Sequence, residues 1–186
     1  MSARVRYQID ANVSQFTVHA FASGLAAVVA HNPKFAVRDF SGEAEFVPGT
    51  LAEASIRMKI KASSLELQDE VSEYDLHEIK RVAFQEVLEI SKFPEIVYES
   101  SQITVTRLSE NLFAASITGN LGLHGVKNRV DFTAQVVVGE DTLRGYGNFA
   151  VKQSDYGIAT ASIAGGTLKM KDELKLAFFI VAKKQG

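Results

Sequence analysis

Four histidines have the widest catalytic and metal-binding chemistry in this chain, and they lie far apart in the sequence: His19, His31, His77 and His124. Their spacing matches no metal-binding motif, such as the helical histidine pair that binds zinc in metalloproteases. The chain has no cysteine, which excludes disulfides, zinc–thiolate sites and thiol nucleophiles. We therefore predict neither a metal site nor a cofactor.

Three of these histidines also have a plain structural interpretation. His124 precedes Gly125, a pair typical of a tight hairpin turn in which glycine supplies a positive φ. His19 lies on a predicted strand, where a hydrogen-bonded barrel histidine is more common than a ligand contact. His31 precedes an Asn-Pro pair, which indicates a turn.

Searches for other catalytic patterns find nothing. The chain has no G-x-S-x-G nucleophile elbow and no phosphate-binding glycine loop. Its isolated acids have no evident partner, which leaves no candidate acid–base pair. Three lysines near the C-terminus indicate a solvated strand face, with a membrane-surface role as the minor alternative: Lys169, Lys171 and Lys175. We therefore predict no catalytic residue and no enzymatic activity.

The composition of the 186 residues, 46% hydrophobic and 23% charged, is that of a globular protein. We expect a single domain over residues 1–186, without a transmembrane segment. Twenty basic and 22 acidic residues give a net charge of −2, which argues against nucleic acid as a partner. The start of the chain lacks the pattern of a signal peptide, so the expected location is the cytoplasm. Twelve Phe and five Tyr supply a large apolar surface.

Alternation of apolar and polar residues dominates the chain and predicts half-buried strands. In the strongest example, 126–138, the residues Val126, Val130 and Phe132 should face inward. The predicted strands cover residues 5–9, 16–21, 35–47, 54–62, 96–101, 103–108, 114–123, 126–138, 143–151 and 174–182. Many short strands with turn signals between them favour an antiparallel barrel or sandwich.

One segment has helical spacing instead. Residues 72–91 carry apolar side chains three and four positions apart, and Ser72 with Asp75 resembles an N-terminal cap. Phe93-Pro94 should end this helix, because the residue before a proline is disfavoured in the helical region. A second, short helix is expected within residues 23–30.

A small barrel of this kind either fills its interior with side chains or encloses a cavity for one ligand. Gly119, Gly145 and Gly147 fall in the inward register. There a glycine leaves space, lets another backbone approach, or marks a bend or bulge in a filled barrel. The pattern alone favours the filled barrel.

Several motifs resemble those of the YceI-like family, over nearly the whole chain from Tyr7 to Ala182. The hairpin at residues 120–130 is similar to the family's L-T-hydrophobic-H-G-V-x-x-x-V pattern. Other matches lie at residues 7–10, 14–19, 40–42, 93–96 and 153–158. The sequence departs from the family pattern at residues 23–38, at Gly122 and at residues 74–79.

The resemblance implies a mainly β protein: an extended antiparallel lipocalin-like barrel of about eight or more strands, with the one substantial helix near residues 72–91. It also implies a non-enzymatic role: binding, storage or transport of a long-chain polyisoprenoid, an isoprenoid quinone or a similar amphiphile in an apolar tunnel. Membrane contact would be transient, and a homodimer is left open.

Candidate wall residues follow from the alternation: Phe16, Val18, Ile60, Ile117, Leu121, Val130, Phe132, Phe149, Leu174 and Phe178. His31 is added as a candidate anchor for a quinone or alcohol head group, because it would be a polar group at the end of an apolar tunnel. Two alternatives stay open. One is a packed barrel that serves as an interaction subunit, and the other is a lipid-modifying enzyme with His31 or His19 as its base.

Overall fold

The computed structural model describes residues 3–24, 32–163 and 168–186. Its strands are β1 (Val5–Ile9), β2 (Gln15–His19), β3 (Ala22–Ser23), β4 (Lys34–Val37), β5 (Phe40–Val47), β6 (Ala52–Lys61), β7 (Leu65–Leu67), β8 (Glu95–Arg107), β9 (Leu112–Leu123), β10 (Val126–Val138), β11 (Thr142–Lys152), β12 (Ser162–Ile163), β13 (Leu168–Met170) and β14 (Glu173–Lys184). Its helical segments are the turn η2 (Ala62–Ser64), the α-helix α1 (Glu73–Arg81), the π-helix η3 (Val82–Val87) and the turn η4 (Gln153–Tyr156).

Eight antiparallel strands close into a barrel in the order β1-β5-β6-β8-β9-β10-β11-β14, and β14 pairs with β1 to complete the ring. The long strand β14 has two partners on one side, because its C-terminal part pairs with β1 and its N-terminal part with β2. Strands β4 and β7 extend the sheet beyond β2, and β3, β12 and β13 form a separate small sheet. The prediction of a mainly β antiparallel barrel is confirmed.

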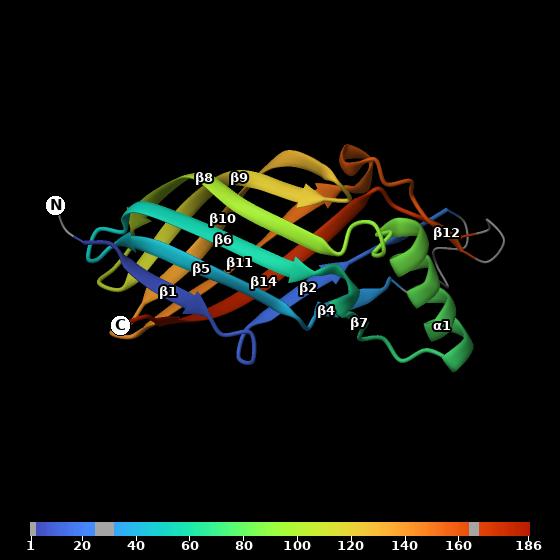
Figure 1. Ribbon diagram of the computed structural model, residues 1–186, viewed down its shortest axis with the longest axis horizontal. Helices are drawn as coiled ribbons and strands as arrows, with labels where there is room; N and C mark the ends of the chain where they lie inside the picture. The colour runs from blue at the N-terminus through green and yellow to red at the C-terminus, as the bar shows by residue number, and fades with distance from the viewer. Residues whose placement is uncertain (1–2, 25–31, 164–167) are drawn as a thin grey trace.

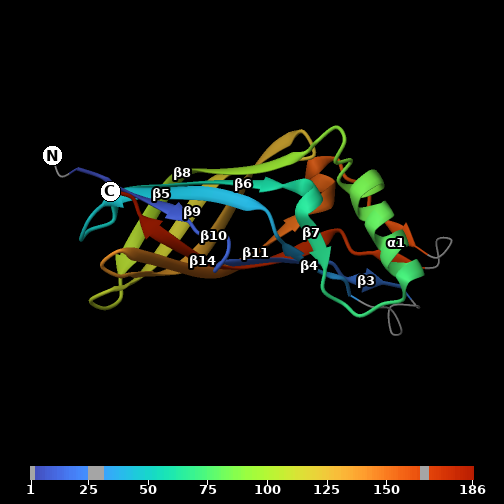
Figure 2. The ribbon, with the colours of Figure 1, turned by 60° about the horizontal axis from the view of Figure 1, so that its bottom comes forward.

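The two ends of the barrel differ. Helix α1 and the small sheet lie at one end, here called the helix end, and the C-terminus lies at the other (Figures 1 and 2). The connections β5–β6, β8–β9 and β10–β11 also lie at this second end, here called the hairpin end. No helix in the described part of the chain combines the length and apolar character that crossing a bilayer would require.

The predicted alternation places the core correctly on most strands. On β6, Met58 and Ile60 are buried while the intervening Lys59 is exposed. Val126 is the exception: the prediction that it faces the interior is wrong, since 37% of its surface is exposed. It directly follows the two-residue turn of His124 and Gly125, which connects β9 to β10.

Some element boundaries differ from the prediction. The strand predicted over residues 35–47 is two strands, β4 and β5, interrupted at Arg38 and Asp39. The two strands predicted over 96–101 and 103–108 are one, β8, whose pairing with β9 shifts register between Ser100 and Gln102. A β-bulge of this kind breaks the alternation without ending the strand.

The predicted helix starts as expected, because the Ser72 hydroxyl accepts a hydrogen bond from the Asp75 backbone N–H at 3.1 Å. It ends earlier than predicted, at Val87, and Glu89 follows with a φ of 44°. This left-handed residue stops the helix before Pro94 can act. Of the short helix expected within 23–30, Ser23 lies in β3 and residues 25–31 lie outside the described residues.

Candidate ligand-binding cavity

The barrel interior holds two adjacent apolar cavities. The helix-end cavity has a volume of about 170 Å³, and the hairpin-end cavity has a volume of about 120 Å³. Phe16, Met58 and Tyr98 line both of them and so mark the boundary between the cavities, here called the junction. Because apolar cavities of this size stay dry and take up apolar molecules, the pair is the candidate interior site for an elongated apolar ligand.

Aromatic rings surround this junction. Phe132 lies at the centre, with ring centroids 5.4 Å from Tyr98, 4.8 Å from Phe149 and 5.7 Å from Phe178. Phe16 stacks on Phe178 at 6.5 Å. These distances suit favourable aromatic pairs. Five of the aromatic side chains of the sequence thus cluster around the junction of the two cavities.

The helical segment covers the helix-end cavity with one apolar face. Four of its side chains and that of Leu88, directly after it, line this cavity: Ile79, Val82, Ala83, Val87 and Leu88. None of the residues of α1 is buried, and Val82 is the buried residue of η3. The cover therefore rests on the barrel through few buried groups.

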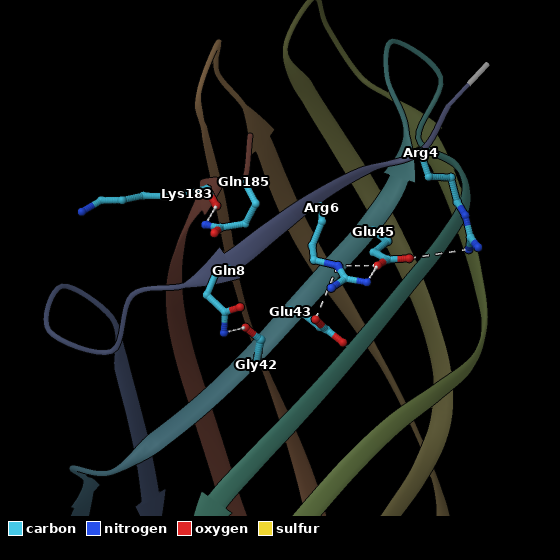
Figure 3. Close-up of polar contacts among 8 residues, drawn as sticks. All are labelled: Arg4, Arg6, Gln8, Gly42, Glu43, Glu45, Lys183 and Gln185. Carbon is cyan, nitrogen blue, oxygen red and sulfur yellow. Dashed lines mark hydrogen bonds and ion pairs between the residues drawn. The ribbon is translucent and has the colours of Figure 1, made fainter.

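Charged side chains lie on the outer face of the barrel. Arg6 on β1 pairs with Glu45 on β5 at 2.6 Å and with Glu43 at 3.6 Å (Figure 3). Glu45 borders the hairpin-end cavity, but this ion pair holds its carboxylate outside. Among the described residues, no charged side chain lines the helix-end cavity. Burial raises the pKa of the Tyr98 phenol to about 12, so this group also stays neutral.

His124 connects the β9–β10 turn to the segment after the helix. Its φ of 53° and the φ of 74° at Gly125 confirm the predicted tight turn. The Nδ1 atom lies 3.2 Å from the Tyr156 carbonyl oxygen, and the Nε2 atom lies 2.6 Å from Glu89 Oε2. His124 is thus a structural tie and lines neither cavity.

The structure brings most of the predicted wall residues together. Helix-end wall positions are Phe16, Val18, Ile60, Leu121 and Leu174. Hairpin-end wall positions are Phe16, Ile117, Phe132, Phe149 and Phe178. Val130 is buried in the core but lines neither cavity, and instead borders an outer groove between β10 and β11. His31 lies outside the described residues.

Sequence reasoning missed other lining residues. Met58 and Tyr98 alternate in step with predicted inward residues, so their position at the junction could have been found from the pattern. Gln153 lines the helix-end cavity. It continues the inward register of β11 by two residues beyond Val151. Because its side chain is polar, the apolar alternation does not include it.

In the part of the chain that the structure covers, no group of three or more His, Cys, Asp or Glu side chains could hold a metal ion. Fold and cavity together define the class of the protein: a closed antiparallel barrel with an apolar interior, as in small-ligand-binding barrels. The chain belongs to the family of the YceI-like domain, whose model matches residues 7–182.

Several solved structures are similar to this one. Burkholderia cenocepacia BcnA shares 20% sequence identity, with 93% of this chain and 98% of that chain covered and a TM-score of 0.71. A polyisoprenoid binding domain from Saccharophagus degradans, implicated in plant cell wall breakdown, shares 12% identity, with coverages of 96% and 98% and a TM-score of 0.69. The Campylobacter jejuni YceI protein shares 19% identity, with coverages of 81% and 84% and a TM-score of 0.59. No curated protein matches the chain.

Proposed function

We propose that this protein binds a long-chain polyisoprenoid, an isoprenoid quinone or a similar amphiphilic lipid in its barrel and stores or transports it without catalysis. The observation that carries this proposal is the pair of adjacent apolar cavities that share Phe16, Met58 and Tyr98 in their walls. Family membership supports it, as does the fold shared with a domain described as polyisoprenoid binding.

The binding energy would come from burial. Each methylene group removed from water contributes about 0.8 kcal/mol, so a tail of many carbons is held without a specific polar contact. Such a wall distinguishes ligands mainly by length and shape. We therefore expect the protein to accept several tail types and to select chiefly for length.

The two alternatives receive less support. A packed interaction subunit would fill its interior with side chains, whereas this barrel encloses two cavities. For a lipid-modifying enzyme, His19 lines neither cavity, and His31 lies outside the described residues. Neither histidine therefore supports the enzymatic alternative. A cytoplasmic location and a homodimer stay predictions from the sequence.

The test uses the absence of tryptophan from the chain. Phe16→Trp places a single fluorophore at the junction of the cavities, and Tyr146→Trp places one on the outer face, where Tyr146 is 41% exposed. Geranylgeraniol should shift the emission of the first variant and leave the second unchanged. Mass spectrometry of organic extracts from the purified wild type should also find a prenyl lipid. Extracts without lipid, together with no heat of binding in calorimetry of the wild type, would refute the proposal.

A further inference from the structure

Gln153 is an unusual residue in this barrel. It is 4% exposed and, the tyrosines apart, is the one buried residue with a polar side chain among those the structure describes. It begins turn η4, directly after β11, and lines the helix-end cavity among apolar neighbours. A polar group in such a position is costly unless it is hydrogen-bonded.

The surroundings fix the orientation of its side-chain amide. The Nε2 atom donates to the carbonyl oxygen of Lys171 at 3.0 Å and to that of Asp172 at 3.4 Å. Carbonyl oxygens only accept, so the NH₂ group must face them and Oε1 must point away. No described residue donates to Oε1. Gln153 lines the helix-end cavity, and Oε1 is the polar atom of its side chain that none of the described residues occupies.

The same turn is held rigidly from the other side. The Asp172 carboxylate accepts from the Ser154 backbone N–H at 2.8 Å and from the Ser154 hydroxyl at 2.5 Å. The Gln153 backbone N–H donates to the Asp172 carbonyl at 2.9 Å, and its carbonyl accepts from the Ile158 N–H at 3.1 Å. Gln153 is thus a positioned acceptor, and a ligand need not order it on binding.

The character of this site determines which head group fits. No charged side chain of the described residues lines the helix-end cavity, so a phosphate or carboxylate would be buried there without a counter-charge, at high cost. A hydroxyl group instead supplies a donor, which none of the described residues gives to Oε1. We propose that Gln153 Oε1 accepts a hydrogen bond from the hydroxyl of a neutral prenyl lipid, a prenol or a prenylated hydroquinone, whose tail extends past Phe16 towards the hairpin end.

This proposal rests on the proposed function and makes it chemically specific. A hydroquinone donates through its hydroxyl groups, whereas the oxidised quinone presents only acceptors to Oε1. The site should therefore bind the reduced form more tightly than the oxidised form. It should likewise prefer a prenol to its methyl ether, which has the same tail but no donor.

The experiment measures calorimetric affinities for two matched pairs: geranylgeraniol with its methyl ether, and a geranylgeranyl hydroquinone with its quinone. One neutral hydrogen bond predicts that the wild type prefers the donor of each pair by about tenfold. Gln153→Met keeps the approximate length of the side chain and should reduce both preferences to about one. Gln185→Met makes the same substitution at an exposed glutamine that lines neither cavity, and should leave both preferences unchanged.

The possible outcomes separate the two proposals. If the wild type binds the donor and non-donor of each pair equally, or binds geranylgeranyl pyrophosphate most tightly, the role of Gln153 is refuted while lipid binding stands. An unchanged preference in Gln153→Met has the same meaning. Failure of every prenyl compound to bind the wild type would refute the proposed function itself. The wild-type comparisons decide the question even if Gln153→Met does not fold.

Discussion

Gly145 offers a direct way to shorten the cavity. It lies in the inward register of β11, opposite Val136 on β10 and Ile180 on β14, and lines the hairpin-end cavity. A Cβ atom built at Gly145 would meet no heavy atom within 4 Å, and its φ lies outside the left-handed region. A leucine at this position should therefore enter the cavity without straining the strand.

The expected effect on binding follows from the volume that the leucine takes. Its side chain of four carbons occupies space that a long ligand would otherwise fill. At about 0.8 kcal/mol per carbon, the loss is about 3 kcal/mol, or an affinity lower by about 200-fold. A tail too short to pass the junction should bind Gly145→Leu as it binds the wild type.

The stability of the unliganded protein should rise, although the affinity for long ligands falls. Burying the leucine side chain in the cavity contributes about 1.5–3 kcal/mol to the free energy of unfolding, and removing a strand glycine adds about 0.5–1 kcal/mol. The same variant should thus be more stable and yet bind long ligands less well. A general disturbance of the barrel would lower both quantities.

The assay is calorimetric titration with geraniol, farnesol and geranylgeraniol, together with urea unfolding. Gly122→Leu is the matched control, because Gly122 faces outward on β9 and its added Cβ would lie 3.6 Å from the Val97 carbonyl, an ordinary contact. The reasoning fails if Gly145→Leu weakens all three prenols equally, if it weakens none, or if it lowers stability while Gly122→Leu does not.

Three further substitutions test the supporting contacts. Tyr98→Phe removes the hydroxyl that donates to a buried backbone carbonyl at 3.2 Å, and should lower the free energy of unfolding by about 1 kcal/mol in urea titrations. Lys92 and His124 hold the pKa of the Glu89 carboxyl below its ordinary value of 4.5, so its ionised form stabilises the fold above that pH. The stability difference between wild type and Glu89→Gln should therefore be constant near neutrality and shrink as the pH falls below 4.5. Ser72→Ala removes the N-cap and should speed amide exchange in α1 about fivefold, as expected for about 1 kcal/mol; unchanged exchange would contradict the capping role.

Alternation predicts most of the barrel because one face of each strand must pack against a common interior. Apolar residues therefore recur at every second position of a strand. It does not reveal how that interior is used. Gly119 and Gly147 lie in the same register as Gly145, but their added Cβ atoms would lie 2.5 Å from the Glu99 carbonyl and 2.6 Å from the Thr133 carbonyl. The first two glycines allow close packing and the third borders open space. Only the neighbouring strands distinguish these uses.

The sequence predicts that the helix ends before Pro94, but it does not predict the residue at which the helix ends. Pro94 does forbid the helical conformation at the residue before it, but the chain leaves the helix earlier, after a π-helical turn and through the left-handed Glu89. The hydrogen bond between Glu89 and His124 joins residues 35 positions apart in the sequence. No local pattern contains such a partner, so propensity alone could not locate this boundary.

The two barrel ends have different packing, and this bears on how a lipid would enter. The hairpin end contains the buried side chains Tyr7, Phe46 and Phe113, and Tyr7 stacks on Phe46 at 5.2 Å. The cover at the helix end contributes Val82 as its buried residue. Because the cost of local opening rises with the apolar surface that is exposed, we expect the helix end to open first. A lipid that entered there tail first would leave its head group beside Gln153, as the proposed acceptor role requires.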